Sequence, residues 1–261
     1  MKLTVIGGGG VRSLMLAKSL AQNAKEYNIT HIVFMDNNVQ KLNIFGALAR
    51  EVAIRIMPSL DFTLTTNPVE AIQGADYIIT TIRAGEDDMR IRDERIALAH
   101  NVLGQETTGA AGFSFAMRSV PALAEYCELV RKYANPNAKV FNFTNPAGVV
   151  SQTLRDMGYD FTFGICDAPT GMLRSFAHLY GIAPETVTAT CYGLNHLSFF
   201  NSIQFSGKEM LPTLINDDRI YATTDMRFFS KELTKKMGCI LNEYLYYFFY
   251  REKAVQNILD A

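Results

Sequence analysis

The stretch VIGGGGVRSL, residues 5–14, decides the fold. It follows an apolar run that begins at Lys2, and it opens a helical pattern over 11–25. Amide groups at the start of such a helix can hold a pyrophosphate, and glycines let the backbone approach it closely. A tight strand-to-helix turn would need the same glycines. The stretch predicts a dinucleotide site formed by Gly7, Gly8, Gly9, Gly10, Val11 and Arg12.

A carboxylate at the end of the next apolar run supports this prediction. Counted from Gly7, the motif G-x-G-x-x-G is imperfect, because Arg12 takes the place of the third glycine. Asp36 ends the run HIVFMD (31–36), where a carboxylate can accept hydrogen bonds from ribose hydroxyls. It could instead cap the helix that follows. An acid here favours NAD over NADP because it repels a 2′-phosphate, and Arg12 weakens that preference slightly.

Apolar, β-rich runs alternate with longer amphipathic stretches up to about residue 185. Strands are expected at 2–7, 31–36, 62–66, 77–83, 139–146 and 161–167. Helices are expected at 11–25, 38–56, 68–73, 88–101, 114–133, 147–157 and 170–180. Strands that are apolar on both faces and alternate with helices indicate a parallel sheet covered on both sides. The fold class is therefore α/β, with a Rossmann-type, doubly wound, mostly parallel sheet.

The pattern changes near residue 185, where we place a soft domain boundary. The segment TVTATCYGLNHLSFFNSIQF (186–205) reads as antiparallel strands, and polar and helical segments follow it. We predict an NAD-binding domain over 1–185 and the start of an α+β substrate and metal domain over 186–261. Because the chain stops at AVQNILDA within a helical pattern, we expect the second domain to be truncated.

Composition excludes several functional classes. The 261 residues carry a net charge of -1, which gives no electrostatic basis for binding nucleic acid or an anionic membrane. No apolar run approaches the ~20 residues that span a bilayer. The four cysteines form no CxxC motif, so we expect a reduced, cytoplasmic setting.

Polar residues that could bind a ligand follow the last predicted strands. Asn145 and Cys166 lie at the ends of the runs 139–146 and 161–167, and His196 comes thirty residues after the cysteine. Ligands bind at the carboxyl ends of strands in open α/β sheets. A thiolate and an imidazole can share a borderline divalent metal, although two ligands are too few for a structural zinc site. A buried inert thiol and a satisfied core histidine are the alternatives.

Several further segments occur in a fixed order after the glycine run. They are IRAGEDDMRIRDERIAL (82–98), GQETTGAAGFSFAMRSVP (104–121), NFTNPAG (142–148), CDAP (166–169), YGLNH (192–196) and NEYLYYFFY (242–250). Together they resemble glycoside hydrolase family 4, the NAD- and manganese-dependent glycosidases that act mainly on 6-phosphoglycosides. The resemblance runs from residue 1 to about 252. This family is an exception to the usual two-carboxylate mechanism of glycosidases.

The resemblance implies a redox mechanism. NAD would take a hydride from C3 of the sugar, and the resulting ketone would acidify the C2 proton. A base removes that proton, the aglycone leaves from C1, water adds, and the hydride returns. A divalent metal, Mn²⁺ or another, would stabilise the enolate, with Cys166 and His196 as its matching ligands. Asp167 matches the proton donor to the leaving group, and its alternative role is a helix N-cap.

The resemblance also assigns the C2 base and the contacts with substrate and cofactor. Tyr244 in NEYLYYFFY matches the base, with Tyr246 and Tyr247 as the neighbouring candidates, although a packed aromatic helix would look the same. Arg90 and Asn145 match substrate contacts, and Arg83 is assigned to the cofactor. Arg90 could instead pair with Asp93 or Glu94 on its own helix. The segment GQETTG (104–109) looks like a loop lining nicotinamide and sugar, or a plain connection between helices.

Specificity signals point in two directions. Asp after the cysteine is typical of phospho-α-glucosidases, whereas the contexts YGLNHLSFF and YFFYREKA resemble phospho-β-glucosidases. We predict a 6-phospho-β-glucosidase, with a 6-phospho-α-glucosidase or another family 4 glycosidase as the alternative. Two further alternatives remain: a malate/lactate-type NAD-dependent dehydrogenase and a truncated NAD-binding protein without activity. The expected partners are a small-molecule 6-phosphoglycoside and, in the full-length form, further copies of the chain in a dimer or tetramer, with no nucleic acid and no membrane.

Overall fold

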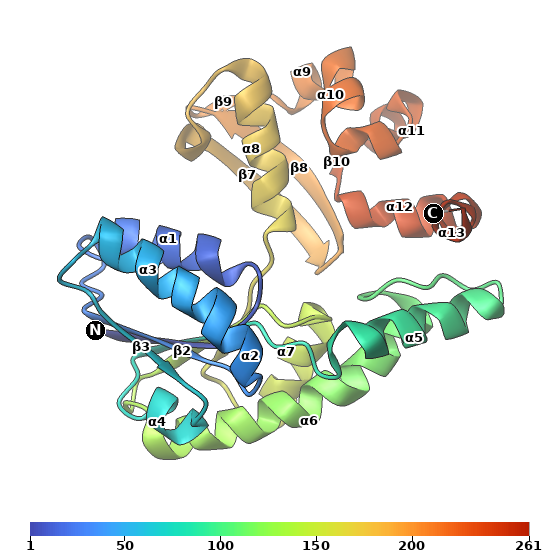
Figure 1. Cartoon of the computed structure of the whole chain (residues 1–261). Helices are drawn as coiled ribbons and strands as arrows, with labels where there is room; N and C mark the ends of the chain where they lie inside the picture. Colours follow the sequence, from blue (N-terminus) through green and yellow to red (C-terminus); the bar gives the residue numbers. More distant parts are fainter. Residues whose placement is uncertain (261) are drawn as a thin grey trace. The chain divides into compact units, whose positions relative to one another are not determined.

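Residues 1–260 are described in a computed structural model, and the chain divides into two compact units (Figure 1). The first unit comprises residues 1–97 and 105–165, and the second comprises residues 98–104 and those from Cys166 onward. The elements that begin in the first unit are β1 (Lys2–Ile6), α1 (Ser13–Asn23), β2 (His31–Met35), α2 (Val39–Lys41), η1 (Leu42–Gly46), α3 (Ala47–Ile56), β3 (Asp61–Thr65), α4 (Pro68–Ile72), β4 (Tyr77–Thr80), α5 (Glu86–Ala99), α6 (Gly109–Tyr133), β5 (Lys139–Asn142), α7 (Ala147–Asp156) and β6 (Thr162–Gly164).

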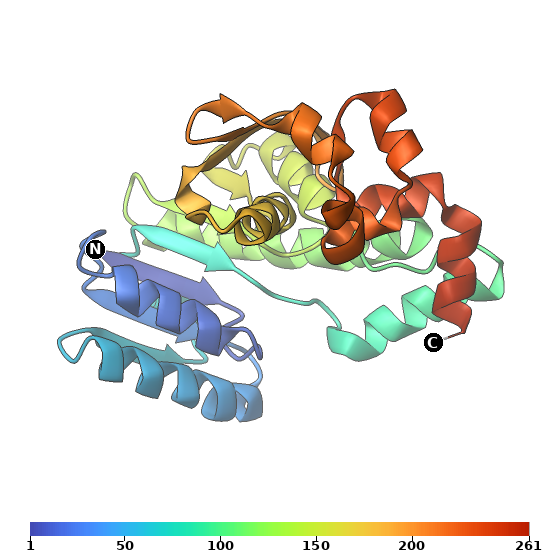
Figure 2. The ribbon, with the colours of Figure 1, turned by 90° about the horizontal axis from the view of Figure 1, so that it is seen from above.

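The first unit is built on a sheet of six parallel strands in the order β3-β2-β1-β4-β5-β6. Helices α1 and α3 cover one face, and α4, α6 and α7 cover the other (Figure 1). Successive residues of one strand serve opposite faces: Val5 packs with α1 and α3, and Ile6 packs with α4 and α6. The predicted doubly wound parallel sheet is confirmed. Figure 2 shows its strands pointing the same way, so their carboxyl ends lie along one edge.

The predicted helix over 38–56 is interrupted. Its first turn, α2, leads into a π-helical turn at Leu42–Gly46, and α3 follows. Gly46 allows close packing there, because a Cβ at this position would lie 2.9 Å from Leu42 Cδ1 and 3.1 Å from Leu64 Cδ2. Hydrophobic periodicity does not distinguish a π turn from an α turn, so the sequence could not reveal it.

The second unit combines a small antiparallel sheet with short helices. Its elements are α8 (Ala168–Tyr180), η2 (Pro184–Thr186), β7 (Val187–Leu194), β8 (Leu197–Phe205), β9 (Lys208–Glu209), α9 (Leu211–Asn216), α10 (Asp218–Thr223), η3 (Asp225–Phe228), α11 (Lys231–Met237), β10 (Ile240–Leu241), η4 (Glu243–Leu245), α12 (Tyr246–Phe249) and α13 (Arg251–Leu259). Strand β8 pairs with β7, β9 and β10, all antiparallel. The predicted antiparallel strands within 186–205 are thus observed.

Helix α8 belongs to this second unit. Met172 and Phe176 are buried in one core with Phe200 and Ile240, and Figure 2 views the helix nearly along its axis. The compact units therefore divide after Ile165, whereas the sequence pattern changes near residue 185. The physical reason is that α8 reads as one more helix of the alternating pattern, although its apolar face packs against the antiparallel strands.

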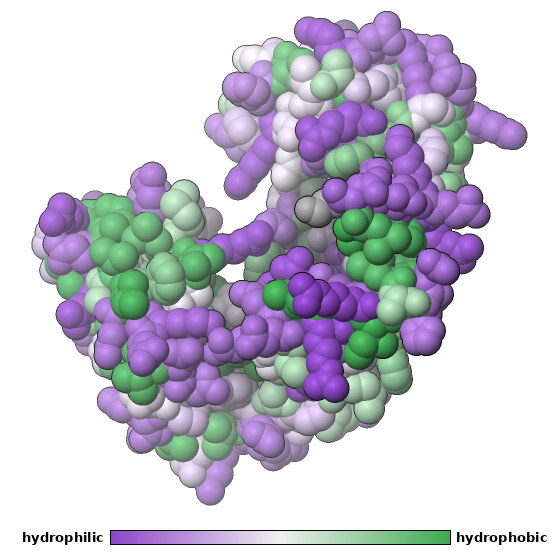
Figure 3. Space-filling model, turned by 45° about the vertical axis from the view of Figure 1, so that its right-hand side comes forward, coloured by the Kyte–Doolittle hydropathy of each residue, from purple (hydrophilic) through white to green (hydrophobic). Residues whose placement is uncertain are grey.

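Apolar residues also reach the surface of both units. In the space-filling view they gather in several places among hydrophilic side chains (Figure 3). The large apolar side chains that are exposed include Val11, Phe113, Leu194 and Phe248. None of the helices within residues 1–260 is both long enough and apolar enough to cross a membrane.

The core of the second unit can be tested by truncating Phe176, which is 0% exposed. We expect Phe176→Ala to lower the free energy of unfolding by roughly 3–5 kcal/mol, because the ring leaves a cavity that its neighbours fill only partly. The matched control is Phe248→Ala, since that ring is 54% exposed and should cost little. Urea denaturation followed by circular dichroism measures both variants. Equal losses for the two would contradict this assignment of the core.

Candidate functional site

The glycine loop is held between the ends of β2 and β4. The amides of Gly7 and Gly8 both donate to the carbonyl of Met35 at 2.9 Å, and the hydroxyl of Thr81 donates to the carbonyl of Gly7 at 3.1 Å. A Cβ at Gly8 would lie 2.6 Å from Phe34 Cβ, and Gly7 has a φ of 100°. Side chains at these two positions would therefore push the loop away from the strands beneath it.

Asp36 ties the glycine loop to the end of β2. Its Oδ2 accepts the amide of Gly9 at 2.8 Å, and its Oδ1 accepts the amide of Asn38 at 2.9 Å. The N-cap of α2 is Asn38, whose side chain accepts the amide of Lys41 at 3.0 Å. A carboxylate oxygen has more than one acceptor direction, so Asp36 can hold the loop and still accept a ribose hydroxyl.

The loop suits a dinucleotide. Val11 and Arg12 are exposed just before α1, whose first helical residue is Ser13. Bare backbone at Gly7–Gly10, a helix N-terminus and an acid at the end of the next strand are the parts that such a cofactor requires. These parts lie together in the first unit, as the sequence predicts.

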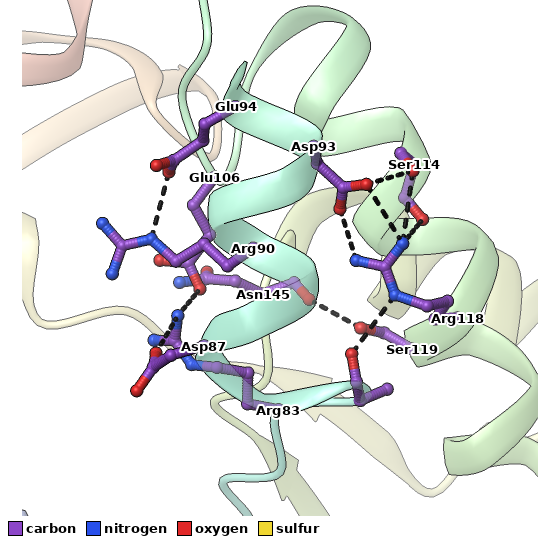
Figure 4. A network of polar contacts seen from close by, with 11 residues as sticks. Arg83, Asp87, Arg90, Asp93, Glu94, Glu106, Ser114, Arg118, Ser119 and Asn145 are labelled. Atoms are coloured by element: carbon purple, nitrogen blue, oxygen red, sulfur yellow. Dashed lines mark hydrogen bonds and ion pairs between the residues drawn. The ribbon is translucent and has the colours of Figure 1, made fainter. Parts of the chain in front are cut away.

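Arg83 is the predicted cofactor residue beyond the glycine loop. It lies in the segment between β4 and α5, where its Nη1 is 3.0 Å from Glu106 Oε1 and 3.3 Å from Asp87 Oδ1 (Figure 4). Glu106 belongs to the predicted loop 104–109. The amide of Thr107 donates to the Gln105 side chain at 2.7 Å, so this loop is folded on itself as well as paired with Arg83.

The two predicted substrate residues lie in the same unit. Arg90 on α5 donates from Nε to Glu94 Oε1 at 3.0 Å, and its terminal nitrogens point away from that carboxylate (Figure 4). Of its two expected helix partners, Glu94 is therefore the one it meets. Asn145 follows β5 and is half-buried, and its carbonyl accepts the hydroxyl of Ser119 at 3.1 Å.

A thiol and an imidazole meet in the second unit. Cys166 Sγ lies 3.4 Å from His196 Nε2. The cysteine is half-buried two residues beyond the end of β6, and His196 is 5% exposed in the turn between β7 and β8. Burial lowers the pKa of His196 to about 4, and the Asp167 carboxylate opposes that shift. The imidazole is therefore neutral near pH 7 and can offer a lone pair to a metal.

The structure brings these two predicted ligands together, and their chemistry fits a borderline divalent metal. Within residues 1–260, no group of three or more His, Cys, Asp or Glu side chains is arranged to hold a metal ion. A metal bound by Cys166 and His196 would keep coordination positions for oxygens of a substrate, as catalytic rather than structural sites do. The thiolate and the imidazole suit a borderline metal, and substrate oxygens in the open positions would give Mn²⁺ the ligands that it prefers.

Tyr244 lies flat against His196. The two ring centroids are 3.6 Å apart and the ring planes differ by 3°. Tyr244 belongs to η4, which precedes the aromatic helix α12, and its ring contacts that of Tyr247 at 5.9 Å between centroids. The packed aromatic cluster is thus present too, but Tyr244 is the tyrosine stacked on the histidine. Tyr246 packs on Phe228 and Tyr250.

Asp167 occupies the N-cap position of α8 without a side-chain capping bond. Its backbone carbonyl instead accepts the hydroxyl of Thr170 and the amide of Gly171. The Asp167 carboxylate therefore does not cap α8, which was the alternative to its predicted role as a proton donor.

Sequence reasoning assigned no role to Glu243, which precedes Tyr244. Its Oε2 is buried without a hydrogen-bond partner. Burial raises the pKa of Glu243, and the carboxylates of Asp225 and Asp167 raise it further. Only its position beside Tyr244 could have marked it in the sequence.

Comparisons with known proteins assign both parts of the chain to the same family. Residues 2–182 match the model of family 4 glycosyl hydrolases, and residues 191–261 match that of the family 4 C-terminal domain. The 6-phospho-beta-glucosidase BglT of Thermotoga maritima is 30% identical over 99% of this chain and 61% of its own length. A 6-phospho-alpha-glucosidase of Leptotrichia buccalis is 32% identical over 81% of this chain and 49% of its own length.

Solved structures agree with these relatives. The 6-phospho-beta glucosidase of Thermotoga maritima with manganese, NAD+ and glucose-6-phosphate aligns at a TM-score of 0.90 and 29% identity. The alignment covers 100% of this chain and 62% of that one. This chain therefore spans less than two thirds of the length of the relatives it matches.

The buried imidazole gives a prediction for the pH dependence of stability. Below pH ~6.5 the unfolded chain binds a proton at residue 196, whereas the folded chain binds it only near pH 4. Stability is therefore lost as the pH falls through this window, by about 3 kcal/mol in total. In metal-free urea titrations, His196→Gln should lose less stability than wild type between pH 6.5 and 4. His178→Gln, a control at an exposed histidine on α8, should lose as much stability as wild type. If the free energy of unfolding changes with pH equally in all three proteins, His196 is not the group responsible.

Proposed function

This chain belongs to the family 4 glycosyl hydrolases, and from that premise we propose that it cleaves 6-phosphoglucosides with NAD and Mn²⁺ as cofactors. The observation that carries the proposal is the 3.4 Å contact between the Cys166 thiol and the His196 imidazole. That contact gives a metal-binding pair in one unit, and the glycine loop with Asp36 gives a dinucleotide site in the other. The manganese, NAD+ and glucose-6-phosphate bound by the Thermotoga maritima relative are the ligands these two sites suit.

Each group of residues has its own task in the proposed reaction. When bound, NAD supplies a hydride acceptor and donor, and the metal supplies a Lewis acid. Gly7–Gly10 and Asp36 would hold the dinucleotide, with Arg83 as a further contact. Cys166 and the neutral imidazole of His196 would hold the metal. Arg90 and Asn145 would hold the phosphosugar, Arg90 through the nitrogens that point away from Glu94.

Two residues would move protons. Tyr244 would take the C2 proton, and its stacking on His196 fixes the ring beside a metal ligand. A tyrosine with a pKa of ~10 needs a neighbouring positive charge to act as a base at neutral pH, and a cation held by His196 would supply one. Asp167, which follows the proposed metal ligand Cys166 in the chain, would donate a proton to the leaving group.

We propose the β-linked substrate. The phospho-β relative aligns over 99% of this chain, and the phospho-α relative over 81%. Asp167, next to the cysteine, favours the α-linked substrate, which is therefore the second candidate. Family membership speaks against the malate/lactate-type dehydrogenase. A small-molecule phosphosugar partner, a homo-oligomer and a cytoplasmic location all stay predictions.

Hydrolysis of paired α- and β-linked 4-nitrophenyl 6-phosphoglucosides tests the function. We expect turnover of the β-linked compound that disappears when NAD⁺ or Mn²⁺ is withheld, because each supplies a step that no side chain replaces. Faster release from the α-linked compound would reverse the order of the two candidates. NAD⁺ binding without cleavage of either compound would leave a nucleotide-binding chain without activity.

Two substitutions separate the roles of the metal pair and the base. Cys166→Ser should raise the Mn²⁺ concentration needed for half-maximal activity sharply, since a hydroxyl is a poorer ligand than a thiolate. Tyr244→Phe should leave that Mn²⁺ requirement near wild type and lower kcat by about 10²–10⁴-fold, the usual contribution of a general base. Cys191→Ser, at an exposed cysteine, is the control for the first change. An unchanged metal requirement in Cys166→Ser would remove Cys166 from the site.

A further inference from the structure

We infer that Arg118 and Ser119, adjacent residues of α6, are positioning residues that set the side chains of Arg90 and Asn145 for a phosphosugar and that of Arg83 for the dinucleotide. The inference deepens the proposed function and rests on it. All the residues involved lie in the first unit, and Figure 4 shows them together around α5 and α6.

Arg118 joins α6 to α5 through a bidentate ion pair with Asp93. Its Nη2 pairs with Asp93 Oδ2, and its Nη1 lies 3.4 Å from Asp93 Oδ1. Asp93 is 8% exposed, and its Oδ1 also accepts the hydroxyl of Ser114 at 2.8 Å. Two parallel contacts between guanidinium and carboxylate fix orientation as well as distance. Asp93 is one helical turn beyond Arg90, so this ion pair sets the helix turn that carries Arg90.

The same guanidinium also fixes the segment before α5. Arg118 Nε donates to the carbonyl of Ala84 at 3.3 Å. The next residue, Gly85, has a φ of 86°, and a Cβ there would lie 3.3 Å from Arg118 Nε and 2.6 Å from Met89 Cγ. A side chain at residue 85 would therefore clash with Met89 and crowd the Arg118 guanidinium. Because Arg83 immediately precedes Ala84, this contact sets where Arg83 leaves the backbone.

Ser119 extends the support to a third segment. It is 0% exposed, and its hydroxyl donates to the carbonyl of Asn145, after β5, at 3.1 Å. Two consecutive residues of one long helix thus contact the β4–α5 segment, α5 itself and the β5–α7 segment. Helices hold functional groups more accurately than loops do, so α6 serves as the rigid reference for three loop-borne or helix-end side chains.

Arginine is required for this arrangement. A lysine keeps the charge but offers one nitrogen, so it cannot pair with both oxygens of Asp93 and also reach the carbonyl of Ala84. Arg118→Lys therefore removes the orientation and keeps the electrostatic attraction. The variant separates positioning from simple charge balance.

Calorimetric binding of glucose 6-phosphate to the whole chain with NAD⁺, together with steady-state kinetics, tests the inference. Arg118→Lys should weaken the Kd for glucose 6-phosphate about tenfold and raise KM by a similar factor, with kcat within about threefold, because the interaction lost is made in ground and transition states alike. Ser119→Ala, which changes only the Asn145 contact, should weaken Kd by a smaller factor. The control is Arg131→Lys on the same helix, whose exposed pair with Glu128 should leave Kd unchanged.

The outcomes separate the inference from the proposed function. A Kd for Arg118→Lys and Ser119→Ala within twofold of wild type overturns the inference, even if both variants melt at a lower temperature. A wild-type chain that binds glucose 6-phosphate but cleaves no phosphoglucoside refutes the proposed function, and the Kd comparison then still decides the inference. If Arg118→Lys does not fold, Ser119→Ala decides alone. No binding by the wild-type chain overturns both.

Discussion

The contact between the Cys166 thiol and the His196 imidazole is the constraint on which the candidate site of the second unit depends. His196 is placed by a two-residue turn between β7 and β8, and Asn242 fixes that hairpin from outside by donating to the carbonyl of Ser198 at 3.1 Å and to its hydroxyl at 3.3 Å. The Asn242 side chain also accepts the amide of Tyr244 at 3.0 Å. One buried asparagine therefore links the histidine-bearing hairpin to the tyrosine stacked on its histidine, and a shift of one residue in the pairing of β8 with β10 would break both bonds to Ser198.

Burial controls the charge around this contact. It lowers the pKa of His196 and raises that of Glu243, so it favours the neutral form of both groups. The Asp167 carboxylate acts on both: it opposes the shift of the histidine and adds to that of the glutamate. A cation held by Cys166 and His196 would thus meet a neutral imidazole rather than a competing positive charge. The same burial that costs the chain stability at low pH prepares the nitrogen as a ligand.

The sequence predicted the parts whose signals are local. Alternating apolar runs predicted the parallel sheet, and the glycines with Asp36 predicted the loop now found between β2 and β4. The sequence could not predict pairings between residues that lie far apart in the chain. Asp93 was one of two alternative partners of Arg90, but it pairs with Arg118 on α6, twenty-five residues away in the chain. Burial of Glu243 was equally invisible, since an acid beside aromatic residues carries no periodic signal.

Backbone strain occurs in the segment between β4 and α5 and in the turn between β7 and β8, where ligands are expected to bind. Five residues other than glycine adopt a positive φ in the described chain, and three of them are Asn28, Asn101 and Ser206, small polar residues of the kind that turns favour. The other two are Glu86, φ 53°, and His196, φ 61°. Each is held by side-chain contacts: Glu86 pairs with Lys41 at 2.8 Å, and His196 meets Cys166. Such a conformation is unfavourable by about 1–3 kcal/mol and persists only where surrounding contacts offset it. The glutamate links the segments after β2 and β4, which flank the glycine loop, and the histidine belongs to the proposed metal pair, so both strained residues lie where ligands are expected to bind.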